Sequence, residues 1–208
     1  MGKRLIQPVS DNMDKQKTYA ENMAKYKKAM AGEFYFEAML IDYAMLEDRL
    51  RSFLYHIALL KGRESYKADN TPVKDKIKAI VAEYKDKDEN DSLTISSISG
   101  KIKIVKSTLR WAVNTCGTDN DPYLTILKKQ YEGTLDIGDV LDRLSDISNW
   151  CAYRNEVIHA LLNKNTGSLM KELPLQAERG MELARFMDDQ VKKLKKGNVI
   201  RRKLKLPS

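Results

Sequence analysis

Apolar residues recur at helical spacing along most of the chain. The strongest stretch spans residues 33–61, where one face alternates steps of four and three through Met39, Tyr43, Leu46, Leu50, Phe53, Ile57 and Leu60. This spacing is typical of a long core helix, and Gly62 is expected to end it. The polar, helix-favouring residues 11–31 predict an earlier helix that breaks at Gly32.

The same reading predicts helices along the rest of the chain. Thr71-Pro72 opens a helix whose apolar side carries Val73, Ile77, Ile80, Val81 and Tyr84. Residues 86–92 and 116–122 have loop composition, and the spacing of Ile102, Val105, Leu109 and Val113 favours a helix between them over a strand. A short helix over 123–131 follows. Asp136 is expected to cap a long helix to about Leu162, and Pro174 lies near the start of a last helix that ends near Lys196.

Long helices with short connections predict an all-α fold, an antiparallel helical bundle. We divide the chain into an N-terminal helical extension (1–32), a bundle domain (33–191) and a basic C-terminal tail (192–208). No apolar run is long enough to span a membrane, so we expect a cytoplasmic protein without a membrane partner. With two His and two Cys among 208 residues, we expect neither a metal site nor a cofactor. Cys151 falls in an apolar helical pattern and is expected to be a buried thiol.

Positive charge is concentrated at the C-terminal end. Residues 192–208 hold eight Lys or Arg and no acid, whereas the whole chain carries a net charge of +8, so residues 1–191 are neutral. Such an arm attracts polyanions, RNA before membranes. The candidate substrate-binding residues are Lys192, Lys193, Lys195, Lys196, Arg201 and Arg202. The alternative is a solvated terminus that binds nothing specific.

An arginine interrupts the apolar stripe of the helix predicted over 136–162. The stripe runs through Val140, Leu144, Ile147, Cys151, Ile158 and Leu161, and Arg154 takes the place of its missing member. Burying an unpaired guanidinium is costly, so Arg154 must meet an anion, a second chain or a water-filled cleft. Asn155 and His159 are four residues apart, which allows the amide to hydrogen-bond and orient the imidazole. Tyr153 could stack on a base, although an aromatic residue there is more often part of the core.

These residue types can cleave RNA without a metal. A histidine that titrates near neutrality can accept the proton of a ribose 2′-OH or donate one to the leaving 5′-oxygen. An arginine can hold the scissile phosphate and offset its growing charge. Arg154, Asn155 and His159 together supply a single histidine. Two proton-transfer roles therefore call for two copies of the chain related by a two-fold axis.

At Arg154-Asn155-Glu156-Val157-Ile158-His159 the sequence resembles the HEPN superfamily. Its ribonuclease members carry Arg, a polar residue that is often Asn, and then His, late in an α-helical domain. Residues 33–61, with Glu47, look like the long N-terminal helix of that family. The resemblance covers roughly residues 33–190. It implies a homodimer with the motif at the interface and metal-independent endoribonuclease activity that leaves 2′,3′-cyclic phosphates. It also implies a toxin–antitoxin or antiviral defence role, with an antitoxin or regulatory partner.

Two details of the motif refine this interpretation. Leu161 stands where nucleotidyltransferase-controlled HEPN toxins have a tyrosine, so adenylylation at this position is not expected. Arg51 and His56 have the same loose spacing as Arg154 and His159, but they lack the asparagine and lie off the stripe of their helix. We therefore favour the later motif and expect His56 to be structural or on the surface.

Two alternatives remain open. A catalytically silent HEPN-like module would bind RNA or nucleotides, or serve in assembly, without cleaving. A helical scaffold unrelated to RNA would instead use the stripe from Met39 to Leu60 for a second chain.

Overall fold

A computed structural model describes residues 12–62, 71–115, 120–160, 167–196 and 199–206, and all the regular elements in these ranges are helices. In chain order they are α1 (Asn12–Ala31), α2 (Tyr35–His56), α3 (Lys74–Tyr84), α4 (Ile98–Asn114), α5 (Pro122–Thr134), α6 (Ile137–Ala160), α7 (Gly167–Lys195) and α8 (Val199–Lys203). The prediction of an all-α helical bundle is confirmed. The predicted end of the 136–162 helix lies outside the described residues, as does Cys116, the second of the two cysteines.

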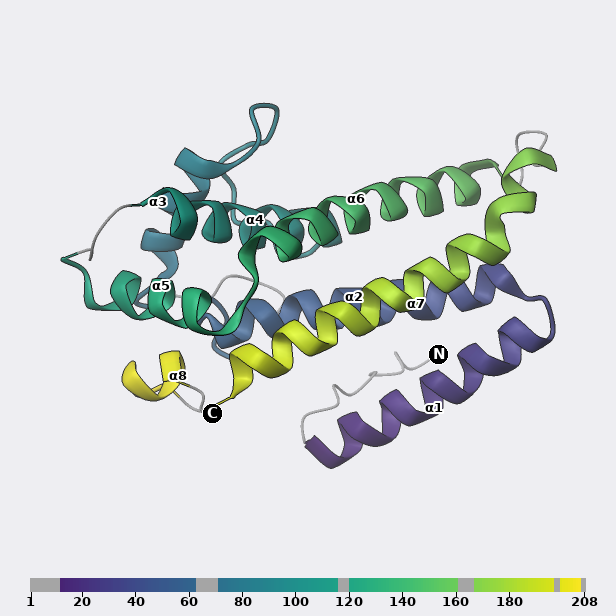
Figure 1. Ribbon diagram of the computed structural model, residues 1–208, viewed down its shortest axis with the longest axis horizontal. Helices are drawn as coiled ribbons and strands as arrows, with labels where there is room; N and C mark the ends of the chain where they lie inside the picture. Colours follow the sequence, from purple (N-terminus) through teal and green to yellow (C-terminus); the bar gives the residue numbers. More distant parts are fainter. Residues whose placement is uncertain (1–11, 63–70, 116–119, 161–166, 197–198, 207–208) are drawn as a thin grey trace, which may run out of the picture.

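The longest helices, α1, α2, α6 and α7, form the body of the molecule (Figure 1). Helices α2 and α7 lie side by side and run in the same direction, since Asp42 lies by Gly180 and Arg49 by Asp188. Helix α1 returns along α2 in the opposite direction, and α6 runs antiparallel to α7. Helices α3, α4 and α5 gather at one end of these long helices.

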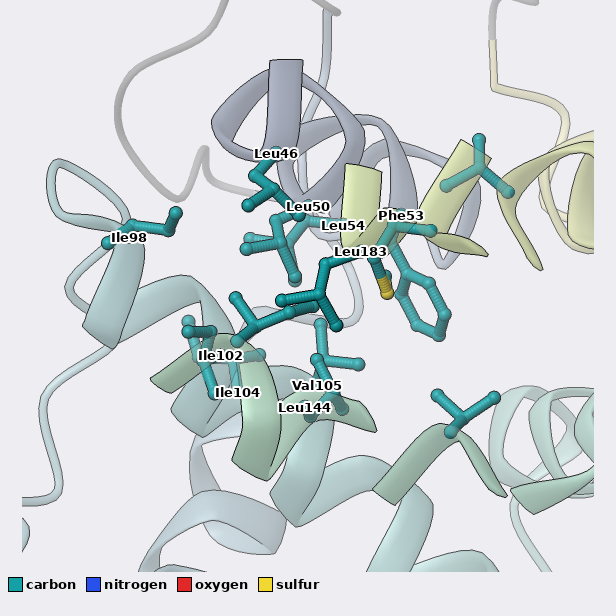
Figure 2. Packing of buried hydrophobic residues seen from close by; sticks show 14 of the residues in the cluster. Leu46, Leu50, Phe53, Leu54, Ile98, Ile102, Ile104, Val105, Leu144 and Leu183 are labelled. Atoms are coloured by element: carbon teal, nitrogen blue, oxygen red, sulfur yellow. The ribbon is translucent and has the colours of Figure 1, made fainter. Parts of the chain in front are cut away.

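The core lies where α2, α4, α6 and α7 meet. Figure 2 shows Leu46, Leu50, Phe53 and Leu54 of α2 among side chains of α4, α6 and α7. The predicted stripe of α2 is buried apart from the half-buried Tyr43. Tyr26 and Ala29, within the predicted N-terminal extension, join the same core. The helix predicted from the spacing of Ile102, Val105, Leu109 and Val113 is α4, and of these four residues only Val113, in its last turn, is exposed (59%).

Helix α2 ends earlier than Gly62. Ala58 adopts a left-handed backbone with φ of 67°, and its N–H donates to the Tyr55 carbonyl over 3.0 Å. The Leu59 N–H donates to the Leu54 carbonyl over 3.0 Å. These two bonds form a Schellman motif, which satisfies carbonyls that the helix end leaves open. The predicted end at Gly62 is therefore wrong, because the motif forms with alanine where glycine is usual.

The start of α6 agrees with the sequence. The Asp139 N–H donates to the Asp136 Oδ1 over 3.1 Å, so Asp136 caps the helix as predicted. Pro174 lies inside α7, which begins at Gly167, and not near its first turn. The cap at Asp136 fixes where α6 starts and hence where Arg154 emerges along it.

Candidate functional site

Arg154 lies on α6 at the surface between α6 and α2, and it is half-buried. Its guanidinium carbon stands 4.2 Å from the centroid of the Tyr43 ring of α2. A guanidinium held over an aromatic face gains a cation–π attraction while its edge stays open to hydrogen-bond partners. The sequence predicted an anion, a second chain or a water-filled cleft for Arg154, and the contact within this chain is instead an aromatic ring.

Asn155 follows Arg154 on the exposed side of α6. Its Oδ1 accepts a hydrogen bond of 3.1 Å from the Arg154 Nη1. We expected its amide to orient His159, but among the described residues the only hydrogen bond of the Asn155 side chain is the one with Arg154. The Arg154 Nε is buried and has no hydrogen-bond partner within the described part of the chain. The pair therefore keeps an unused guanidinium donor.

His159 is exposed one helical turn beyond Asn155. The two residues are separated by about 6 Å along the helix axis. Tyr153, on the other side of Arg154, is half-buried and packs against the core. The structure thus places Asn155 and His159 on the exposed side of α6 and the half-buried Arg154 between α6 and α2, with Tyr153 in a largely structural position. At 100° per residue, Arg154 and His159 stand roughly 140° apart around the helix.

Two residues near this stretch were not singled out from the sequence. Tyr43 was counted as a member of the apolar stripe, and burial raises the pKa of its hydroxyl. Lys101 of α4 is 1% exposed, and its Nζ lies 3.0 Å from the Glu47 carboxylate one turn after Tyr43. The signal for Lys101 is the alternation of lysine with apolar residues at the start of α4. Cys151 is buried as expected, and burial raises the pKa of its thiol to about 12.

The second Arg and His pair, in α2, lies elsewhere. His56 is 5% exposed, so the expectation of a structural residue holds for its burial. Counted at 100° per residue, His56 stands roughly 220° around α2 from Tyr43, on the far side of the helix from Arg154. The two histidines of the chain therefore do not share a site within one molecule.

The predicted basic tail divides into exposed and buried residues. Lys192, Lys193 and Lys195 belong to the last turn of α7. Lys192 pairs with Asp188 over 2.6 Å, and this hydrogen-bonded pair raises the pKa of the Lys192 ammonium. Lys196 and Arg202 are exposed. These side chains are accessible to an anionic ligand.

Arg201 is the exception, and its prediction as an RNA-binding residue of an exposed arm is wrong. It is 0% exposed. Its Nη1 donates to the carbonyls of Tyr55 (3.1 Å) and Leu60 (2.8 Å), its Nη2 to that of Lys61 (2.9 Å). The guanidinium also lies 3.8 Å from the centroid of the Tyr55 ring. Arg201 thus ties α8 to the end of α2, because its fixed fork of donors reaches the Leu60 and Lys61 carbonyls and shares the Tyr55 carbonyl with the Ala58 N–H.

Comparison of this chain with protein families, curated proteins and solved structures finds no match. Within the described residues, no helix combines the length and apolar character needed to cross a membrane. No group of three or more His, Cys, Asp or Glu side chains in those same ranges is placed to hold a metal ion.

Proposed function

We propose that this chain is a HEPN-type, metal-independent endoribonuclease whose reactive residues are Arg154, Asn155 and His159. The observation that supports this most is the position of Arg154 over the Tyr43 ring, bound to Asn155, with His159 exposed on the next turn. This arrangement keeps a phosphate-binding group and a proton-transfer group on one rigid helix.

Cleavage proceeds by attack of the ribose 2′-oxygen on the adjacent phosphorus. His159 accepts the 2′-OH proton as the new P–O2′ bond forms. The P–O5′ bond breaks, and the 5′-oxygen takes a proton from a general acid. The products are a 2′,3′-cyclic phosphate and a 5′-hydroxyl. Arg154 binds the non-bridging oxygens and offsets the charge that develops on them, while Asn155 holds the guanidinium or contacts the substrate.

The general acid comes from a second copy of the chain. The only other histidine, His56, is buried on the far side of α2. A two-fold homodimer that brings two α6 surfaces together supplies a second His159 and a second Arg154. The exposed basic residues at the C-terminal end, Lys192, Lys193, Lys195, Lys196 and Arg202, add an affinity for RNA that salt weakens. A cytoplasmic role as a toxin or in antiviral defence, restrained by an antitoxin or regulatory partner, follows from the HEPN resemblance.

The deciding experiment compares cleavage of total RNA in EDTA by the wild type, His159→Ala and Arg154→Ala. Removal of a proton-transfer or oxyanion-binding group is expected to slow cleavage by about a hundredfold or more. Asn149→Ala is the matched control, since Asn149 is another exposed residue of α6. His56→Gln tests the second histidine while keeping a buried polar side chain of similar size. A product end is identified as a 2′,3′-cyclic phosphate when a phosphatase removes its phosphate only after mild acid has opened the ring. Chain mass is measured by light scattering.

Cleavage that survives His159→Ala would contradict the mechanism. A wild type that binds RNA but never cuts it would identify a silent HEPN-like module. The helical-scaffold alternative loses its basis, because the stripe from Met39 to Leu60 that it would offer to a second chain is buried in this chain's own core apart from Tyr43.

A further inference from the structure

A cavity of 420 Å³ lies between α1, α2 and α7, away from Arg154. Its volume falls within the range of about 300–1,000 Å³ that is typical of small-molecule sites. The charged residues of its lining are the cations Lys15, Arg49, Lys192 and Lys195 and the single carboxylate Asp188. Asp48 and Asp189, which do not line the cavity, also pair with cations of the lining. Four cations against three carboxylates leave one positive charge to attract an anion.

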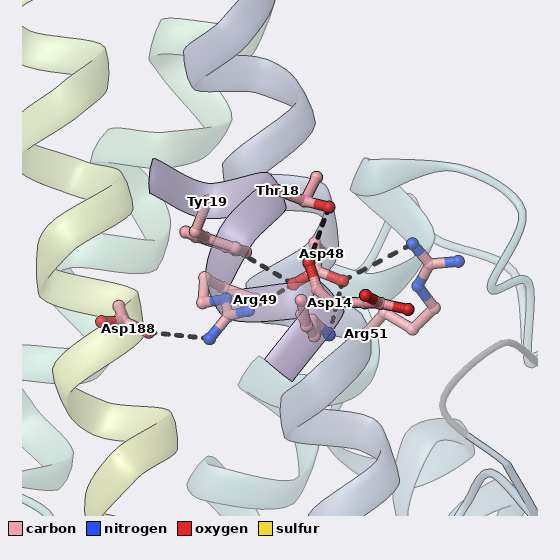
Figure 3. A network of polar contacts seen from close by, with 8 residues as sticks. Asp14, Thr18, Tyr19, Asp48, Arg49, Arg51 and Asp188 are labelled. Carbon is pink, nitrogen blue, oxygen red and sulfur yellow. Dashed lines mark hydrogen bonds and ion pairs between the residues drawn. The ribbon is translucent and has the colours of Figure 1, made fainter. Parts of the chain in front are cut away.

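Arg49 is held in this wall by carboxylates on both sides (Figure 3). Its Nη1 donates to the Asp188 Oδ1 over 2.7 Å, and its Nη2 donates to the Asp48 Oδ2 over 2.5 Å. The guanidinium lies over the Tyr19 ring at 4.3 Å, and the Tyr19 hydroxyl donates to Asp48 over 3.0 Å. Burial opposes ionisation of Asp48, but the charges of Lys15 and Arg49 hold the pKa of this carboxyl below its usual value. The wall is therefore fixed before any ligand arrives.

One cation of the lining is not used by this network. Carboxylates lie within 4.0 Å of Lys15, Arg49 and Lys192. Among the described residues, no carboxylate pairs with Lys195, in the last turn of α7. Three further polar side chains line the cavity: Gln16 from α1, and Ser52 and His56 from α2. A free ammonium and polar side chains from three helices thus converge on one space.

We propose that this cavity binds a small phosphate-bearing molecule of the size of a nucleoside monophosphate. A monocarboxylate is a weaker candidate, because Asp188 already supplies one carboxylate to Arg49 and Lys192. A phosphate group brings about two negative charges and three acceptor oxygens, enough to engage Lys195 together with the polar side chains of the lining. The site lies away from Arg154, because Ser52 stands roughly 180° around α2 from Tyr43. It shares Lys192 and Lys195 with the basic residues proposed to add affinity for RNA. The proposal does not rest on the activity of His159.

The test is calorimetric titration of the full chain with adenosine 5′-monophosphate and with adenosine. We expect the monophosphate to bind at least about tenfold more tightly than adenosine, and inorganic phosphate to compete with it. Lys195→Glu should weaken binding of the monophosphate by about tenfold or more. Lys196→Glu is the matched control, since Lys196 is the exposed neighbour that does not line the cavity. Neither lysine has a carboxylate partner in the described ranges, so both variants are expected to keep the melting temperature of the wild type.

Three outcomes would overturn the proposal. The first is equal affinity for adenosine and adenosine 5′-monophosphate. The second is equal weakening of monophosphate binding by Lys195→Glu and Lys196→Glu. The third is that no mononucleotide binds, whereas an RNA oligonucleotide binds and Lys195→Glu weakens its binding. RNA cleavage is measured separately, so a failure here leaves the ribonuclease proposal to its own test.

Discussion

At the scale of single residues, Asp42 places a carboxyl inside the interface between α2 and α7. The side chain is 0% exposed, and neither oxygen has a hydrogen-bond partner among the described residues. A Cβ at Gly180 of α7 would stand 2.7 Å from its Oδ2 and 2.5 Å from Trp150, so only glycine allows this approach. Burial raises the pKa of Asp42 to about 8, against the smaller opposing effect of the Arg185 charge. The carboxyl is therefore largely protonated at neutral pH.

This protonation makes stability depend on pH. The unfolded chain releases the Asp42 proton near pH 3.8 and the folded chain near pH 8. Between these values the folded state binds more protons, so the free energy of unfolding falls as pH rises, by up to about 1.4 kcal/mol per pH unit. Asp42→Asn removes this dependence. The free energy of unfolding of the variant should therefore rise relative to that of the wild type from pH 5 to pH 8. Urea denaturation across this range measures it, with the exposed Asp142→Asn as control. A constant difference from pH 5 to pH 9 would contradict the prediction.

Glu33 occupies a left-handed position that favours glycine. Its φ is 60°, and the Phe34 N–H donates to the Ala29 carbonyl over 2.8 Å, as in the motif that ends α2. Because Glu33 is exposed and a Cβ is disfavoured in this conformation, Glu33→Gly should raise the free energy of unfolding by about 0.5–1 kcal/mol. Glu37→Gly, at an exposed position in the first turn of α2, should instead lower it, because glycine costs helix stability. Chemical denaturation of both variants tests the pair, and destabilisation by Glu33→Gly would refute it.

Single residues also show what sequence reasoning could reach at the candidate site. The position of Arg154 on an apolar stripe was predictable, because helical periodicity fixes which residues share a face. Its contact with Tyr43 was not, because the two residues are far apart in sequence and meet only when α2 and α6 pack. Gly32 was correctly expected to break α1, but the residue with positive φ is its neighbour Glu33.

At the scale of elements, α8 closes the end of α2 through Arg201. Arg201→Met removes the arginine donors from three carbonyls, of which Tyr55 keeps the Ala58 N–H, and we expect it to lower the free energy of unfolding by about 3 kcal/mol. Arg202→Met changes an exposed neighbour and should alter it by no more than about 0.5 kcal/mol. Urea midpoints measure both effects. Equal destabilisation by the two substitutions would show that Arg201 is not the link between these helices.

The elements themselves were largely predictable, and their ends less so. Apolar periodicity identified the long helices, and the residue type of Asp136 identified it as a cap. The end of α2 was misplaced because Ala58 carries none of the signal that glycine gives. The sequence of α8 suggested an exposed arm, since a run of cations shows nothing of the distant carbonyls that bury one of them.

At the scale of the whole molecule, α2 separates two polar surfaces. Tyr43 faces Arg154 and α6, whereas Ser52 and His56 face the cavity formed with α1 and α7. The stretches that form the cavity, near residues 15–19, 49–56 and 188–195, are joined by no motif in the sequence. Such a site follows only from the packing of α1 and α7 on α2.

The bond between Arg201 and Leu60 joins residues 141 positions apart. A ribosome releases the end of α2 long before it has made α8, so for most of synthesis those carbonyls and the Tyr55 ring have no arginine to meet. Contacts of such large separation form late and slow the completion of a fold. The nascent chain therefore spends much of its translation with this end of the bundle uncovered by α8. During that time the end of α2 is the surface to which a chaperone would bind.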